Sequence, residues 1–153
     1  MKLGVPAHKL ILGSPTYGRS FIQTEGPLCP YKADPNGTWE AGVYDYKKLP
    51  LSGCIELWDE VCKSSYCYDS KKKLFITYDT PTSISHKMDY ILRKGLGGAM
   101  FWELDGDVGP TSNPASLLGT TFKWLSPYME NSQNCLSYPT SRYASIRNVS
   151  SQD

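Results

Sequence analysis

The chain has 153 residues, a length typical of one domain, and 40% of them are hydrophobic, which is enough for a packed core. Its 16 basic and 15 acidic residues give a formal net charge of +1, so it lacks the basic excess of proteins that bind nucleic acid or anionic membranes. The longest apolar run, residues 96–102, is far shorter than the roughly 18–20 residues that cross a bilayer. No apolar segment typical of a secretory signal follows Met1. We therefore expect neither a nucleic-acid partner nor a membrane partner.

Cysteine and histidine content argues against a metal centre. The spacing of the five cysteines matches no zinc ribbon or finger, and the two histidines are far apart in sequence. We therefore expect no metal site and no cofactor. An odd number of cysteines cannot all pair within the chain. Cys62 and Cys67 flank a short loop that a disulfide could close if the compartment is oxidising, and the sequence leaves the pairing of the cysteines open. The cysteines are Cys29, Cys54, Cys62, Cys67 and Cys135.

The N-terminal third alternates between one apolar run and long irregular stretches. Residues 9–13 form a short apolar run bounded by prolines, which predicts a buried strand. Proline and glycine in residues 14–21 predict the end of regular structure there. Residues 23–42 are rich in Gly and Pro and predict a loop, and residues 43–49 predict a short helix that ends at Pro50.

Three short segments then predict an antiparallel meander. Residues 55–60, 65–68 and 74–78 are rich in apolar and aromatic residues, and short turn-forming stretches separate them. Consecutive strands joined by tight turns pair in antiparallel fashion, so we expect a small sheet here.

A helix and a second strand follow the meander. Thr80 is suited to the N-cap, Pro81 to the first helical position and Gly95 to the C-terminal stop. Residues 96–103 predict a second buried strand directly after the helix. The apolar residues that share one face of the helix are Ile84, Met88, Ile91 and Leu92.

The C-terminal part combines a last helix with a polar tail. We expect the helix to begin at residues 113–114 and to bury four apolar side chains. From residue 129 on, 12 of 25 residues are Ser, Thr, Asn or Gln, too polar a composition to offset the entropy of ordering, so the tail at 127–153 is predicted to be disordered. The apolar side chains of the helix are Leu117, Leu118, Phe122 and Leu125.

Two buried strands, each followed by a helix, are typical of the βα units of a parallel sheet or barrel. A closed (β/α)8 barrel needs about 250 residues, and this chain supplies two such units. The sequence therefore predicts either a small open sheet or one part of a larger barrel.

Three groups of motifs, in the expected order, resemble glycoside hydrolase family 18, the chitinases. Residues 10–21 are similar to the signature of the seventh barrel strand. Residues 38–40 and 43–46 resemble the start of the small α+β insertion of fungal-type members. Residues 78–81 and 94–103 are similar to the final helix and the eighth strand. The resemblance implies an α/β fold: the C-terminal part of a (β/α)8 TIM barrel, about strands 7 and 8 with their helices, carrying an α+β insertion.

The resemblance also implies a division of the chain. Residues 1–22 correspond to barrel strand 7 and the loop after it, and residues 23–79 to the insertion. Residues 80–126 correspond to the last helices and strand 8, and residues 127–153 to the polar tail.

Four residues are candidates for binding a sugar. By the predicted strands, Tyr17 and Arg19 follow the first barrel strand and Trp102 ends the second, so all three lie at the C-terminal rim where barrel enzymes bind substrate. The family's matching Trp floors the subsite of the sugar to be cleaved, and its Arg lines the cleft. Glu40 lies in the insertion that walls the cleft and accepts hydrogen bonds from substrate in this interpretation. The alternatives are plain packing for Tyr17 and Trp102 and an exposed, solvated side chain for Arg19 and Glu40.

No catalytic residue is assigned within the chain. The family's proton donor belongs to an Asp-x-x-Asp-x-Asp-x-Glu motif on the fourth strand, and further partners belong to a Met-x-Tyr-Asp motif on the sixth. Neither motif occurs in these 153 residues. Glu103 and the acidic residues of 105–107 follow the final strand, so their geometry does not suit them to replace the missing donor.

The resemblance therefore implies part of a chitinase, a retaining enzyme that hydrolyses β-1,4-linked N-acetylglucosamine polymers by substrate assistance, and predicts that this chain is inactive alone. The implied partners are chitin or N-acetylglucosamine oligosaccharides and the missing N-terminal barrel half, and the parent family is extracellular. One alternative is a catalytically dead, lectin-like protein that binds chitin oligosaccharides. Another is a fragment of an endo-β-N-acetylglucosaminidase, which shares the fold and mechanism.

Overall fold

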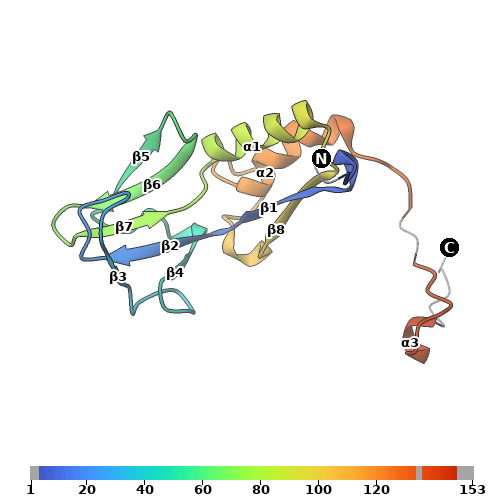
Figure 1. The fold of residues 1–153 in the computed structure, drawn as a ribbon, viewed down its shortest axis with the longest axis horizontal. Coiled ribbons are helices and arrows are strands. Elements are labelled where there is room, and N and C mark those ends of the chain that lie inside the picture. Colours follow the sequence, from blue (N-terminus) through green and yellow to red (C-terminus); the bar gives the residue numbers. More distant parts are fainter. Residues whose placement is uncertain (1–3, 134–135, 148–153) are drawn as a thin grey trace.

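A computed structural model describes residues 4–133 and 136–147. Its smaller sheet pairs β1 (Ile11–Pro15) and β8 (Gly98–Trp102) in parallel. Helices α1 (Pro81–Lys94) and α2 (Leu117–Leu125) pack together beside this pair (Figure 1). The βα units predicted from the sequence are thus present, joined in one small parallel sheet.

The larger sheet is antiparallel and holds six strands. Strands β5, β6 and β7 form the predicted meander, and β2 adds to the free edge of β7. β3 and β4 both pair with β2. The strands are β2 (Tyr17–Ile22), β3 (Lys32–Ala33), β4 (Val43–Asp45), β5 (Ile55–Asp59), β6 (Ser64–Asp69) and β7 (Leu74–Thr77).

The expectation that regular structure ends within residues 14–21 is wrong, because β2 begins at Tyr17. Gly18 fits a strand here because that strand packs closely on the core. A Cβ atom at Gly18 would lie 2.7 Å from a methyl carbon of Leu49 and 2.9 Å from one of Ile76. Glycine therefore permits close packing at this position instead of a turn.

Helix α1 begins and ends as the sequence predicts. The Thr80 N–H donates to the Ser83 hydroxyl at 2.9 Å, Pro81 occupies the first turn, and Gly95 adopts the left-handed conformation at the C-cap. The buried side chains of α1 include the apolar residues Ile84, Met88 and Ile91. The capping residues and the apolar spacing thus suffice to place this helix.

The expectation of two buried barrel strands is wrong. Ile11 is 54% exposed and Met100 49% exposed, and only Ser14 of β1 is buried. The physical reason is that β1 and β8 pair only with each other among the described residues, so that one face of the pair remains open. Ile11, Met100 and Trp102 share this open face by register.

Two other helix predictions are corrected. Residues 43–49 form β4 followed by a 3-10 turn, Tyr46–Lys48, because residues 43–45 pair with β2. Helix α2 begins after the N-cap Ser116, later than expected, and Phe122 is 60% exposed at the edge of a hollow beside α1 and β8.

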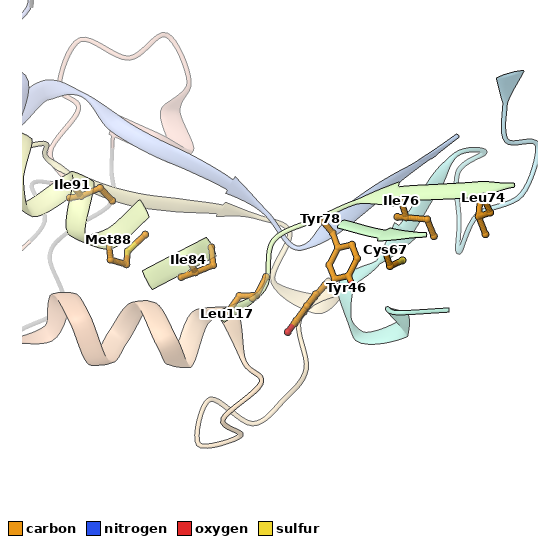
Figure 2. Packing of buried hydrophobic residues seen from close by; sticks show 9 residues of the cluster. All are labelled: Tyr46, Cys67, Leu74, Ile76, Tyr78, Ile84, Met88, Ile91 and Leu117. Carbon is orange, nitrogen blue, oxygen red and sulfur yellow. The ribbon is translucent and has the colours of Figure 1, made fainter. Parts of the chain in front are cut away.

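One hydrophobic cluster joins the two sheets. Figure 2 shows its side chains running from α1 and α2 into the larger sheet, with Tyr78 between the two groups. The insertion and the two βα units therefore share a core. The buried members are Tyr46, Cys67, Leu74, Ile76, Tyr78, Ile84, Met88, Ile91 and Leu117.

The remaining elements are short. The predicted disorder of 127–153 stays a prediction, and its residues 134–135 and 148–153 lie outside the described part. No helix in the described ranges is long and apolar enough to span a membrane. The short elements are the 3-10 turns Ala7–Lys9, Leu104–Gly106 and Ser126–Tyr128 and the helix α3 (Ala144–Arg147).

Candidate functional site

A cavity of about 370 Å³ lies where the chain passes from β1 into β2. Pro15, Tyr17 and Arg19 alternate along this segment and all contribute to the lining. The N-terminal end of β6, the C-terminal end of β7 and the first turns of α1 close the other sides. Their lining residues are Cys62, Lys63, Ser64, Ser65, Thr77, Tyr78, Asp79 and Lys87.

Tyr17 and Arg19 act as a pair on the exposed face of β2. The guanidinium carbon of Arg19 lies 5.6 Å from the centroid of the Tyr17 ring, a cation–π distance. Arg19 forms no salt bridge with the residues that the structure describes. Its donors are therefore available to a ligand.

Trp102 lies next to this cavity but does not line it. Its strand position is directly opposite Pro15, and the Thr16 N–H donates to the Trp102 carbonyl at 3.1 Å. The Thr16 hydroxyl also donates to the Glu103 carbonyl, and the Trp102–Glu103 peptide bond is cis. The indole is 65% exposed, so it is not a core residue. An exposed aromatic ring at this rim can stack against the C–H face of a sugar.

Glu40 lies on a different element from the other candidates. It is exposed, in the loop between β3 and β4, and its backbone forms an isolated bridge with Val43. Val43 is in turn the register partner of Arg19. Glu40 does not line the cavity. The structure thus places Tyr17 and Arg19 together, Trp102 beside them through Pro15, and Glu40 near Arg19 only through the backbone.

Two lysines in the cavity wall were missed by sequence reasoning. Lys87 pairs with Asp79 at 2.5 Å, and the Ser83 hydroxyl donates to the same carboxylate at 2.8 Å. Lys63 pairs with Glu60. Lys87 had no signal, because it lies eight residues after Asp79, outside the three- or four-residue spacing of helical side-chain pairs. Lys63 had none, because a turn lysine is ordinarily solvated.

Among the acidic residues after β8, Asp107 has a structural role. The Asp107 carboxylate accepts bonds from the N–H groups of Val108, Leu117 and Leu118 and from the Ser116 hydroxyl, at 2.8–3.1 Å. These four bonds occupy both carboxylate oxygens and hold the side chain in place at the start of α2. It is therefore unsuited to donate a proton to a leaving group.

Two tyrosines are buried in the core, and one of them, Tyr78, also lines the cavity. The Tyr78 hydroxyl donates to Glu56 at 2.6 Å, and that of Tyr46 donates to the Ala115 carbonyl at 2.8 Å. Burial raises the pKa of Tyr46 to about 12 and that of Tyr78 further, so both phenols stay protonated at neutral pH. The Tyr78 bond connects the end of β7 to β5, and the Tyr46 bond connects the segment after β4 to the segment before α2.

The Cys62–Cys67 pairing considered from the sequence does not form, since both are free thiols. Cys62 is exposed in the turn before β6, and Cys67 is buried along that strand. Three strand steps of about 3.3 Å each separate Ser64 from Cys67, and Cys62 lies further back. The two Cα atoms are therefore too far apart for a disulfide.

Comparison with known proteins shows the class. Residues 1–107 match the family model of glycosyl hydrolases family 18. The chain is 42% identical over 147 residues to Endochitinase 1 of Metarhizium robertsii, covering 96% of this chain and 34% of that protein. It thus spans about one third of the length of the curated relatives it matches.

Solved structures agree. Chitinase ChiA74 from Bacillus thuringiensis matches with a TM-score of 0.71 and 34% identity, over 86% of this chain and 25% of that one. A mutant class V chitinase from Nicotiana tobaccum in complex with NAG4 matches with a TM-score of 0.68 and 25% identity, over 80% and 36%. The comparisons define a glycoside hydrolase; more closely, the chain belongs to family 18.

Proposed function

We propose that this chain forms about the last third of the catalytic domain of a chitinase, an enzyme that hydrolyses β-1,4-linked N-acetylglucosamine polymers. Family membership and the share of the endochitinase relatives that the chain covers support this. The parallel pair β1 and β8 corresponds in this proposal to strands 7 and 8 of a (β/α)8 barrel. Its open face and outer edges are then the surfaces that the rest of the barrel covers.

The domain division follows from the same proposal. Residues 1–22 supply strand 7 and the loop after it, 23–79 the insertion, 80–126 strand 8 with the last helices, and 127–153 a polar tail. β2 lies in the first segment yet pairs with β7 of the insertion, so it joins the two.

The chain's contribution to the reaction is binding and orientation of substrate. Trp102 stacks against the sugar to be cleaved, Arg19 donates to hydroxyl or acetamido oxygens, Tyr17 adds ring contact, and Glu40 accepts from hydroxyls on the insertion side. The observation that carries this proposal is that Pro15 lines the cavity of Tyr17 and Arg19 and is also the direct strand partner of Trp102. The ligand is therefore chitin or an N-acetylglucosamine oligosaccharide.

The chemical step needs groups that these 153 residues do not contain. In the substrate-assisted scheme implied by the resemblance, the sugar's acetamido oxygen attacks the anomeric carbon while a glutamic acid protonates the leaving oxygen. The Asp-x-x-Asp-x-Asp-x-Glu motif that carries that acid is not in the sequence. Loss of a general acid alone typically removes a factor of about 10²–10⁴ in rate, so the isolated chain is inactive. The full enzyme acts outside the cell.

A lectin-like role is the second candidate, and the exposure of Trp102 favours it. An indole that is accessible without the rest of the barrel can hold an oligosaccharide with no chemistry following.

The test combines hydrolysis and retention. The purified chain is incubated with a fluorogenic N-acetylglucosamine dimer glycoside and, separately, with chitin beads. We expect no fluorescence above the blank. Retention on chitin but not on cellulose beads supports a working sugar-binding face, and passage through both columns limits the chain to a fragment that needs its barrel half. Hydrolysis by the chain alone would contradict the assignment of the acid to another segment.

A further inference from the structure

Two cysteine side chains meet on the inner face of the larger sheet, away from the cavity. Cys67 is fully buried in β6, in register with Ile76 and Glu56 on neighbouring strands. Cys54 directly precedes β5, is half-buried, and packs against the same hydrophobic cluster. Figure 2 shows Cys67 within that cluster, between Ile76 and Tyr46. Cys54 and Cys67 therefore both contact the hydrophobic cluster on this side of the sheet.

Backbone contacts hold the two thiols together. The Cys54 N–H donates to the Leu51 carbonyl at 2.9 Å, and the Cys67 thiol hydrogen-bonds to the backbone of the same Leu51. The two thiols are also close enough to shift each other's pKa. Because Cys54 lies just outside the ladder of β5, its position is not fixed by the strand register. It can therefore approach Cys67 more closely than a diagonal pair within two paired strands.

We propose that Cys54 and Cys67 form a disulfide that fastens the segment before β5 to β6 when the chain meets an oxidising thiol buffer. With glutathione disulfide as oxidant, one cysteine thiolate attacks a glutathione sulfur and releases one glutathione thiolate. The second cysteine thiolate then attacks the mixed disulfide and releases the other. The two protein thiols lose two protons and two electrons in total, and one glutathione disulfide becomes two glutathione thiols.

The surroundings of Cys54 and Cys67 also predict how fast the two thiols are oxidised. Burial raises the pKa of Cys67 to about 12 and also raises the pKa of Cys54, so little thiolate exists at neutral pH. Because the thiolate is the reacting form, oxidation in the folded chain is slow and quickens about tenfold for each pH unit in this range. Cys62, in contrast, is exposed and accessible to soluble reagents.

The experiment maps disulfides in the full 153-residue chain. Chain made in a reducing host is incubated with glutathione disulfide at pH 8.5, then acid-quenched, alkylated and digested without reduction. Cleavage after Lys and Arg puts Cys54 and Cys62 in one peptide, 49–63, and Cys67 in another, 64–71. Linkage of these two peptides, about 2 Da below their summed mass, is therefore expected but does not by itself tell Cys54 from Cys62.

Two cysteine variants, and oxidation of the unfolded chain, distinguish Cys54 from Cys62 as the partner of Cys67. We expect Cys62→Ser to keep the linkage and Cys54→Ser to lose it. The same oxidation in concentrated urea should favour the shortest loop, Cys62–Cys67, because loop-closure entropy then selects the partner, so that in urea Cys62→Ser should lose the linkage. Three outcomes would each overturn the proposal: linkage lost in Cys62→Ser, a pairing pattern unchanged by urea, or full alkylation of Cys54 and Cys67 after oxidation.

Discussion

A single carboxylate organises the segment after β8. Asp107 accepts three backbone N–H groups and the Ser116 hydroxyl, and two of those N–H groups, from Leu117 and Leu118, belong to the otherwise unpaired first turn of α2. The charge also lies at the positive end of the helix. Asp107 therefore anchors α2 to the end of the strand that carries Trp102.

Asp107→Asn should destabilise the chain. An amide oxygen can accept only part of this network, and bonds to a charged group contribute about 1.5–3 kcal/mol each, so we expect a loss of about 2–3 kcal/mol in the free energy of unfolding. Urea unfolding followed by circular dichroism measures it. The matched control is Asp105→Asn, at an exposed side chain, which should stay within about 0.5 kcal/mol of wild type. Equal effects from both would contradict the anchoring role.

At the residue scale, the sequence predicts which side chains of the site follow a recognisable strand. It does not predict the side chains that come to the site from distant segments. Tyr17 and Arg19 could be placed together because they alternate along one segment. Lys63 in the cavity wall could not, because the turn before β6 meets β2 only through the strand order of the larger sheet.

Elements with their own capping signals were predicted well, and elements defined by pairing were not. Thr80, Pro81 and Gly95 mark α1 in the sequence, and the structure ends the helix at those signals. β2 carries proline and glycine at or near its start, which indicate a turn locally. It becomes a strand because β7 and β4 offer pairing partners from 24 or more residues away, which no local pattern contains.

Two of the four apolar side chains of α2 that were predicted to be buried should differ in how much their mutation lowers the free energy of unfolding. Leu117 is fully buried and Phe122 largely exposed. We expect Leu117→Ala to cost about 2–5 kcal/mol through lost burial and the cavity left behind, and Phe122→Ala less than about 1 kcal/mol. Paired urea unfolding curves check this, and a larger loss for Phe122→Ala would mean that the helix face is assigned incorrectly.

Asp69, at the end of β6, should make the free energy of unfolding depend on pH in the acidic range. The N–H groups of Lys72 and Lys71 donate to Asp69 and lower the pKa of that carboxyl below its usual 3.8. Because the folded pKa lies below the unfolded one, the ionised carboxylate stabilises the fold above about pH 4, and this contribution is lost as the pH falls. We expect Asp69→Asn to flatten the decline of the urea midpoint between about pH 5 and pH 2.5. Superimposable pH profiles for variant and wild type would rule this role out.

On the scale of the whole molecule, the larger sheet packs against the shared core, while one face of the small parallel sheet is open. The core runs from the larger sheet through Tyr78 into α1, whereas Ile11, Met100 and Trp102 face outward on the open side of β1 and β8. Composition and length predicted that two βα units cannot close a barrel. They could not predict how much of the pair would be exposed, because exposure depends on which other elements pack against the two strands.

The most direct measurement is a calorimetric titration of the purified chain with N-acetylglucosamine tetramer, which gives the binding affinity. Trp102→Ala is compared with Trp124→Ala, which removes an indole from α2, away from the cavity lining. We expect Trp102→Ala to weaken binding at least about tenfold, a loss of about 1.4 kcal/mol, and Trp124→Ala to leave the affinity unchanged. Equal affinity in wild type and Trp102→Ala, or equal losses in both variants, would contradict a sugar-binding face built from Tyr17, Arg19 and Trp102.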